Sequence, residues 1–188
     1  MTDPQKLVAA VLTGDRKAYK SLVLQYQRLV SHIVFRMVPV SADREDMCQE
    51  VFIKVYQHLS GFRFDSQLST WIGRIAYNTC LNFLDKKKLP LINDLGDDDN
   101  EYIPVDTTAT MPDEALENKE LKAILNREIE KLPPVYRTVV TLFHLDHLSY
   151  DEISHITDMP EGTVKSYLFR ARNLLKDRLL RQYRREEI

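Results

Sequence analysis

The segment from Leu148 to Leu175, LSYDEISHITDMPEGTVKSYLFRARNLL, constrains the fold of this chain more than any other. Its pattern predicts a short helix, a tight turn and a longer second helix. On a 3.6-residue wheel, one side of the second helix is apolar and comprises Val164, Leu168, Ala171 and Leu175. The opposite side carries Lys165, Ser166, Phe169, Arg172 and Asn173, with Arg170 at its edge. The segment therefore predicts a helix-turn-helix with one side packed and one side facing a partner.

Phe169 is the unusual member of the polar side. An aromatic ring on a polar face has no core to enter, so it is either incidental or a contact for a partner surface. Among base edges, the thymine methyl group is the natural apolar target. The alternative is an ordinary amphipathic hairpin, but the helix-turn-helix spacing favours contact with DNA.

The charge distribution separates the two ends of the chain. A formal net charge of −2 alone argues against a nonspecific nucleic-acid binder. Residues 91–130, however, hold 12 acids and 3 bases, whereas residues 163–188 hold 8 Lys/Arg and 3 acids. The basic tail comprises Lys176, Arg178, Arg181, Arg184 and Arg185. It either complements a helix dipole or, directly after the second helix, neutralises phosphates, and its position favours the latter.

Several classes of protein are not expected. The chain has 188 residues, of which 44% are hydrophobic, and its start lacks a signal peptide, so we expect a cytoplasmic protein without direct membrane insertion. Cys48 and Cys80 lie in helical patterns without a CxxC or Cys/His cluster, which predicts reduced core thiols and no metal. No nucleotide-binding, metalloprotease or triad motif is present, so we expect neither a catalytic site nor a cofactor.

The remaining pattern is helical and predicts an all-α fold of two domains. We expect a first helix closed by Gly14, a second capped by Asp15, a third capped by Ser41 and ending at Leu59, and a fourth over 68–88. Period-2 alternation is missing, which argues against a sheet. Residues 91–111 are acidic and proline-containing and predict an extended linker between domains at 1–90 and 112–188.

Two details concern the helices of these domains. The third helix carries a second, mostly polar stripe at i, i+3, i+4 and i+7 spacing, formed by Asp46, Gln49, Glu50, Ile53 and Gln57. This stripe is either solvated or the contact for a partner. In the second domain the pattern breaks at Pro133-Pro134. Before the last helix, Pro160 fixes φ and suits a helix start but offers no side-chain cap, which Asp158 would have to supply.

Two stretches carry a resemblance to a known family. DREDMCQEVFIKVYQHLSGFRFDSQLSTWIGRIAYNTCLNFL resembles region 2 of the extracytoplasmic-function (ECF) sigma factors, which belong to the sigma-70 family of bacterial RNA polymerase. LPPVYRTVVTLFHLDHLSYDEISHITDMPEGTVKSYLFRARNLLKDRL resembles their region 4. Both stretches occur in the family's order and spacing, without a folded domain between them. The resemblance implies promoter-specific transcription initiation with core RNA polymerase and promoter DNA as partners.

The resemblance also implies roles for individual residues. The positions that dock on the polymerase clamp match Asp46, Gln49 and Glu50. The positions that contact the −10 element match Phe62, Arg63 and Phe64 in the loop 62–67, which would capture an unstacked base, and Arg74 and Asn78 in the next helix. The positions that contact the −35 element match Lys165, Ser166, Phe169 and Arg170.

Some assignments remain open at this point. Trp71 matches a −10 aromatic but fits a core position equally, and Tyr77 and Leu81 either pack or face a regulator. The acidic linker is either a tether or an insert for the polymerase's RNA channel. The family implies an anti-sigma factor as a further partner. A stand-alone helix-turn-helix regulator is the alternative function, but it leaves the stripe on the third helix unexplained. The promoter sequence and the inducing signal are not encoded in any motif.

Overall fold

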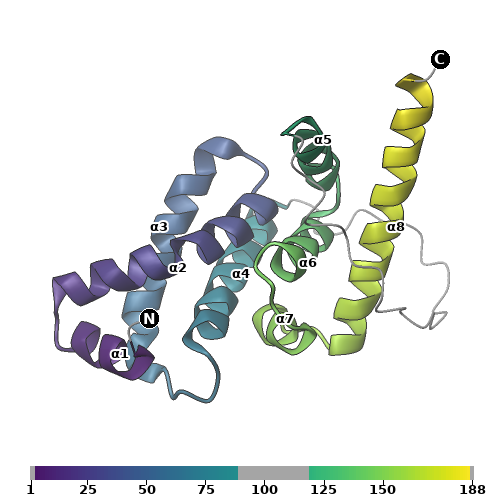
Figure 1. The fold of residues 1–188 in the computed structure, drawn as a ribbon. Coiled ribbons are helices and arrows are strands. Elements are labelled where there is room, and N and C mark those ends of the chain that lie inside the picture. Colours follow the sequence, from purple (N-terminus) through teal and green to yellow (C-terminus); the bar gives the residue numbers. More distant parts are fainter. Residues whose placement is uncertain (1–2, 89–118, 187–188) are drawn as a thin grey trace.

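The computed structural model describes residues 3–88 and 119–186, with side chains over 3–88 and 123–181. Within these residues the chain forms eight α-helices and one short 3-10 helix, and no strand, so the all-α prediction is confirmed. In chain order (Figure 1) they are α1 (Pro4–Leu12), α2 (Arg16–Met37), α3 (Ser41–His58), η1 (Leu59–Gly61), α4 (Leu68–Lys86), α5 (Lys119–Glu130), α6 (Pro134–His144), α7 (Tyr150–Thr157) and α8 (Glu161–Glu186).

Helices α1 to α4 form the first packed unit, with α2 at its centre. The inward face of α2 is fully buried at Leu22, Val30 and Ile33, and it packs against α1, α3 and α4. Asp15 caps α2 as predicted, because its carboxylate accepts the Lys17 backbone N–H at 2.7 Å. The apolar spacing of the sequence therefore determines which side of α2 enters the core.

Helices α5 to α8 form the second packed unit. The break at Pro133-Pro134 is confirmed, since α5 ends at Glu130 and α6 begins at Pro134, where a missing N–H costs nothing. Helix α6 packs against α7 and α8. The predicted apolar side of α8 is its buried side, with Val164, Leu168, Ala171 and Leu175 at most 2% exposed.

The structure corrects two predicted caps. Ser41 is the first residue of α3, and the preceding Val40 makes no side-chain cap, so the predicted Ser41 cap is wrong. Asp158 does not cap α8, because it ends α7 in a left-handed conformation (φ 59°) and its carboxylate points to Arg74. The first turn of α8 instead directs the N–H groups of Thr163 and Val164 to the Pro160 carbonyl, at 2.9 and 3.1 Å.

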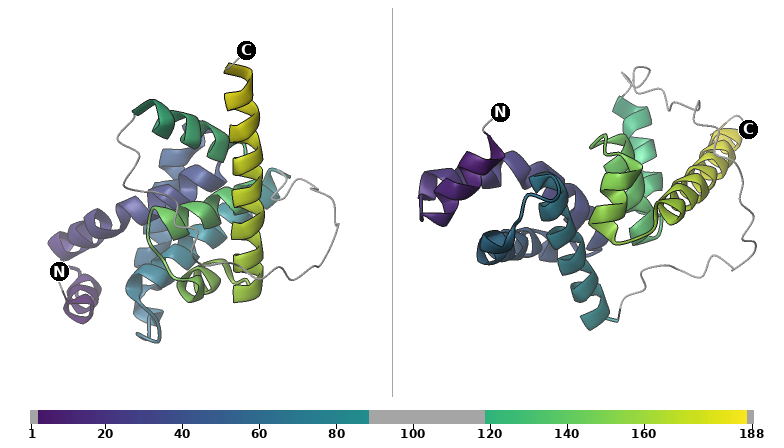
Figure 2. Two further views of the ribbon diagram at one scale, coloured as in Figure 1. Left: turned by 45° about the vertical axis from the view of Figure 1, so that its right-hand side comes forward. Right: turned by 90° about the horizontal axis from the view of Figure 1, so that it is seen from below.

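The two units pack directly against each other. Helix α2 lies along α6, and α4 lies along α7, so buried side chains from both units form one continuous apolar cluster. Figure 2 shows this side-by-side arrangement from two further directions. The sequence predicted two domains and a linker over 91–111, which lies outside the described residues, but it did not predict this packing.

Candidate nucleic-acid interface

A capped helix and a tight turn position α8. Ser149 and Glu152 form a capping box at the start of α7, in which the Glu152 carboxylate accepts the Ser149 N–H at 2.8 Å and the Ser149 hydroxyl accepts the Glu152 N–H at 3.2 Å. The Ser154 hydroxyl donates to the Met159 carbonyl at 2.6 Å and fixes the turn. These bonds hold α7 and α8 in the helix-turn-helix arrangement that the spacing predicted.

The face of α8 opposite its buried side is open to solvent. Ser166 and Arg170 are exposed, while Lys165 and Phe169 are half-buried. Lys165 Nζ lies 3.2 Å from Glu161 Oε2 and 5.2 Å from the centre of the Tyr150 ring. The Ser166 hydroxyl donates to the Gly162 carbonyl at 2.8 Å. The four predicted −35 positions therefore share one face, of which Ser166 and Arg170 are the exposed members.

Arg172 was placed on the polar side of the helical wheel, but its side chain packs against neighbouring protein groups. Its guanidinium carbon lies 5.5 Å from the centre of the Phe143 ring, and its Nη2 lies 3.3 Å from His144 Nε2. A cation held over an aromatic ring is stabilised by the ring's quadrupole, so Arg172 is a packing residue of the second unit. In the basic tail, Lys176 and Arg181 are exposed. Arg184 and Arg185 lie outside the described side chains.

The loop 62–67 separates its aromatic residues into a buried and an exposed one. The Phe62 side chain is only 8% exposed and its ring centre lies 4.6 Å from that of Phe64 and 5.2 Å from that of Trp71. Phe64 is 44% exposed, with a positive φ of 60°, and Arg63 is exposed. Trp71 is half-buried, so it both packs and borders the loop. Phe64 and Arg63 are the groups of this loop that an unstacked base can reach.

Helix α4 carries its two predicted −10 residues on one exposed side. Arg74 and Asn78 are exposed one turn apart. Tyr77, between them, is 3% exposed, and its burial raises the pKa of its hydroxyl to about 12, to which the nearby Tyr167 of α8 adds. Tyr77 therefore packs in the interior and does not face a regulator. Leu81, further along, is partly buried against the core.

The outward face of α3 presents the predicted polymerase-contact residues. Asp46, Gln49 and Glu50 are all exposed, and the Glu50 carboxylate pairs with Lys54 at 2.8 Å. The same face continues into apolar side chains, because Ile53 and Tyr56 are 54% and 52% exposed. A shallow apolar hollow between this end of α3 and the turn from α1 to α2 borders them. This face therefore combines charge with an exposed apolar end, as a protein-binding surface does.

The described residues contain no other chemical centre. They include no group of three or more His, Cys, Asp or Glu side chains that could hold a metal ion. None of the helices described is long and apolar enough to cross a membrane. Cys48 and Cys80 are free, and burial raises the pKa of the Cys80 thiol to about 12 and also raises that of Cys48. Such thiols carry little thiolate at neutral pH and are poor nucleophiles.

Comparison with known proteins agrees with this arrangement. Residues 22–89 match the family model "Sigma-70 region 2" and residues 122–175 match "Sigma-70, region 4". The chain is 41% identical over 183 residues to the ECF RNA polymerase sigma-E factor of Escherichia coli strain K12, covering 95% of each chain. The chain belongs to the ECF group of the sigma-70 family. It is therefore a sigma factor, a member of a family of regulatory DNA-binding proteins that direct promoter-specific initiation.

Further relatives fit the same assignment. The RNA polymerase sigma-H factor of Pseudomonas aeruginosa is 37% identical over 186 residues, covering 97% of this sigma factor and 96% of the relative. Among solved structures, CnrH in complex with the cytosolic domain of CnrY matches with a TM-score of 0.63 at 18% identity, covering 92% and 94% of the two chains. The sigma factor RpoE of Bartonella quintana, in complex with the anti-sigma factor NepR, matches with a TM-score of 0.61 at 23% identity, covering 87% and 97%. These two likenesses show a shared fold.

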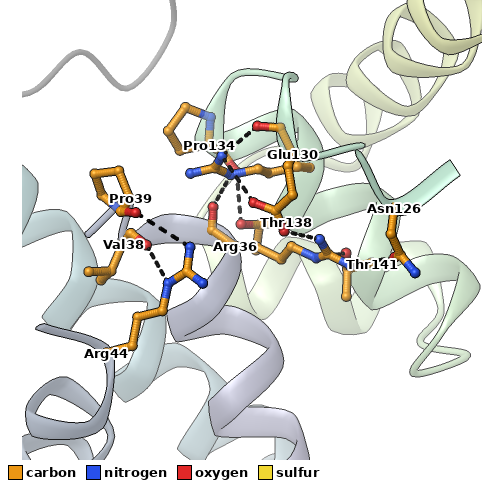
Figure 3. A network of polar contacts seen from close by, with 10 residues as sticks. Arg36, Val38, Pro39, Arg44, Asn126, Glu130, Pro134, Thr138 and Thr141 are labelled. Carbon is orange, nitrogen blue, oxygen red and sulfur yellow. Dashed lines mark hydrogen bonds and ion pairs between the residues drawn. The ribbon is translucent and has the colours of Figure 1, made fainter. Parts of the chain in front are cut away.

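Sequence reasoning did not find the contacts between the two units. Gly73, Asp158 and Arg36 take part in them, the last within the polar network of Figure 3. Asp158 stood out only as a helix cap and the other two not at all, because a glycine in a helix or a single charged residue carries no signal of a distant partner. The packing of Ile156 explains why position 73 is a glycine, because a Cβ there would lie 2.9 Å from Ile156 Cδ1.

Proposed function

We propose that this sigma factor contacts the −35 element through the outer face of α8, which carries Lys165, Ser166, Phe169 and Arg170. The observation that supports this most directly is the exposure of Ser166 and Arg170 on the one side of α8 that the core does not use. A long basic side chain on such a helix reaches guanine edges in the major groove, and a hydroxyl bonds to either base edges or phosphates. Phe169 supplies the apolar contact for a thymine methyl group.

The −10 element is assigned to the loop 62–67 and α4. Phe64 and Arg63 offer an exposed ring and a cation to an unstacked base, which are the groups that bind single strands. Phe62 packs against Phe64, and Trp71 packs against Phe62. Arg74 and Asn78 extend this surface along α4. We assign Phe62 a supporting role because it is buried within the aromatic group.

Core polymerase is assigned to the outer face of α3. Asp46, Gln49 and Glu50 supply polar contacts there. Catalysis of RNA synthesis then belongs to the polymerase, and we propose that the sigma factor carries out no covalent step and acts in the cytoplasm. We also propose an anti-sigma factor as a regulator. Support for it comes from the fold shared with CnrH and the RpoE structure, which are complexes with CnrY and with the anti-sigma factor NepR.

One experiment tests the −35 assignment with the intact holoenzyme. The promoter preferred by core polymerase with this sigma factor is first selected from a randomised duplex library, and binding to −35 variants is then measured at two salt concentrations. Phe169→Ala and Arg170→Ala should each relax preference at defined −35 positions, at roughly 1 to 3 kcal/mol per contact. Lys176→Ala, an exposed cation nearby, is the matched control and should weaken all variants alike and lower the salt slope by about one. If Phe169→Ala weakens every variant equally, direct reading by Phe169 is wrong.

A further inference from the structure

The loop 62–67 holds an exposed aromatic ring in an unusual backbone conformation. Phe64 has a positive φ of 60°, which is unfavourable for a residue with a large side chain, and such strain persists only where the surrounding structure enforces it. Its ring lies against Phe62, with 4.6 Å between the ring centres, and Phe62 in turn packs on Trp71. Phe64 nevertheless stays 44% exposed. This ring is therefore packed on one side and open to a ligand on the other.

Opposite charges flank the Phe64 ring in the chain. Arg63 and Asp65 are its direct neighbours, and both are exposed. Neither side chain makes a hydrogen bond or an ion pair with any residue that the structure describes, and they do not pair with each other. The loop thus presents a free cation, a stacking surface and a free carboxylate at three consecutive positions.

The usual structural reasons for an aspartate before a helix do not apply to Asp65. An aspartate at such a place commonly caps the helix, but the N-cap residue of α4 is Gln67, and no side chain caps α4. A surface carboxylate otherwise pairs with a nearby cation, and within 3–88 and 123–181 Asp65 has no such partner. In a loop assigned to DNA, a carboxylate also repels the phosphates and lowers affinity unless it contacts a base. These observations favour a role for Asp65 in base recognition over a role in stability.

A carboxylate distinguishes the four bases by their hydrogen-bond donors. It accepts hydrogen bonds and donates none, so it binds an exocyclic amino group. Cytosine, adenine and guanine each carry one, at N4, N6 and N2, whereas thymine offers only a ring N–H between two carbonyl groups that repel a carboxylate. An unstacked base leaves this edge open to a side chain. The Arg63 guanidinium only donates, so it suits an acceptor of the same base or the adjacent phosphate.

We propose that Asp65 is a specificity-determining residue of the −10 loop, which accepts a hydrogen bond from the exocyclic amino group of the captured base and so selects cytosine, adenine or guanine against thymine. This inference rests on the proposed −10 assignment. Phe64 supplies a stacking surface that tolerates any base, because every base has a π-face. The bias against thymine therefore comes from Asp65. Since an amide both accepts and donates, Asp65→Asn keeps the size of the side chain but removes this bias.

The first step of the test locates the captured base. Holoenzyme is assembled from core polymerase and the full-length sigma factor, and a single-stranded DNA that it binds is selected from a randomised pool. Fluorescent copies of this strand then carry an abasic site at each position in turn. The captured position is the one at which the loss of affinity caused by the abasic site is much smaller with Phe64→Ala than with the wild type, because the base and the ring then act as one contact.

The second step measures base preference at that position. Strands with each of the four bases are compared, together with one in which the preferred base lacks its amino group. The wild type should bind the preferred amino-bearing base at least about fivefold more tightly than thymine or the base without its amino group. With Asp65→Asn, both ratios should fall to within about twofold, since the amide also accepts the thymine edge.

Asp85→Asn is the matched control for the loss of one negative charge. Asp85 is an exposed aspartate in the last turn of the same helix. Its change to asparagine should shift the affinity for all strands by one common factor and leave both ratios unchanged. Both variants should keep their Tm within about 2 °C of the wild type, because both side chains are exposed.

The outcomes separate this proposal from the −10 assignment. Thymine as the preferred base of the wild type, or ratios that Asp65→Asn leaves unchanged, would overturn the role of Asp65. Ratios that Asp85→Asn lowers equally would also overturn it, because charge alone would then be responsible. In each of these cases the −10 assignment stands as long as one position of the strand depends on Phe64. If no position depends on Phe64, the −10 assignment fails and the role of Asp65 fails with it.

Discussion

Arg137 is expected to stabilise the junction between the two units by capping two helix ends at once. It is only 7% exposed. Its Nε donates to the carbonyl of Arg36, near the end of α2, and its Nη1 donates at 2.8 Å to the carbonyl of Glu130, the last residue of α5. Carbonyls in the last turn of a helix lack partners within the helix, and a cation there also suits the dipole.

The magnitude follows from these contacts. Arg137→Met keeps most of the apolar stem and removes both donors, each of which contributes about 1.5 to 3 kcal/mol as a bond from a charged group. Burial lowers the pKa of Arg137, which means that its charge is partly disfavoured in this site, and methionine removes that cost. We therefore expect a net loss of about 3 kcal/mol in the free energy of unfolding, or a fall of roughly 6 to 12 °C in Tm.

Unfolding can be followed by one probe of the first unit and one probe of the whole protein. Trp71 is the only tryptophan and lies in α4, so its fluorescence reports the first unit, whereas far-ultraviolet circular dichroism reports all helices. Because Arg137 caps α2 as well as α5, both transitions should move to lower temperature. Arg127→Met, an exposed change in the last turn of α5, is the control and should stay within about 0.5 kcal/mol. A loss below about 0.5 kcal/mol for Arg137→Met would refute the capping argument.

Further expectations concern the polymerase-contact face, the −10 surface and the buried Cys80 thiol. Changing Gln49 and Glu50 together to alanine should weaken core-polymerase binding about tenfold. The free energy of unfolding should fall by less than about 0.5 kcal/mol, because Glu50 loses only an exposed i,i+4 ion pair with Lys54. An unchanged affinity for polymerase would show that this face is not part of the interface. Asn78→Ala should impair open-complex formation on duplex promoters more than on premelted ones, as permanganate footprinting can report, because melting costs a few kcal/mol. Burial raises the pKa of the Cys80 thiol from 9.0 to about 12, so its contribution to stability is complete below pH 9 and is lost as pH rises toward 12, by an amount on the order of 2 kcal/mol at pH 11. In urea denaturation, Cys80→Ala should reduce the loss of unfolding free energy between about pH 9 and pH 11. An unchanged loss would contradict the raised pKa of the Cys80 thiol.

The sequence by itself determined the helices, their inward sides and the family. Apolar residues at 3.6-residue spacing identify the buried side of α8 at Val164 and Leu168, because a helix must bury its apolar stripe whatever it packs against. The break at Pro133-Pro134 and the Asp15 cap are local effects of the same kind. The exposed side of α8 could also be predicted from the sequence, because it lies opposite the apolar stripe. The caps at Ser41 and Asp158 were wrong because neighbouring geometry decides which of several polar residues occupies a helix end.

Only the tertiary structure decided how the two units meet and what each surface residue contacts. Phe62 and Phe64 have the same side chain and similar neighbours in sequence, yet one is buried on Trp71 and the other is 44% exposed. Arg74 pairs with Asp158 across 84 positions of the chain, and Gly73 admits Ile156 because it has no Cβ. Such contacts depend on where distant helices lie in space. Periodicity records which side of a helix is buried, but it carries no information about the partner that buries it.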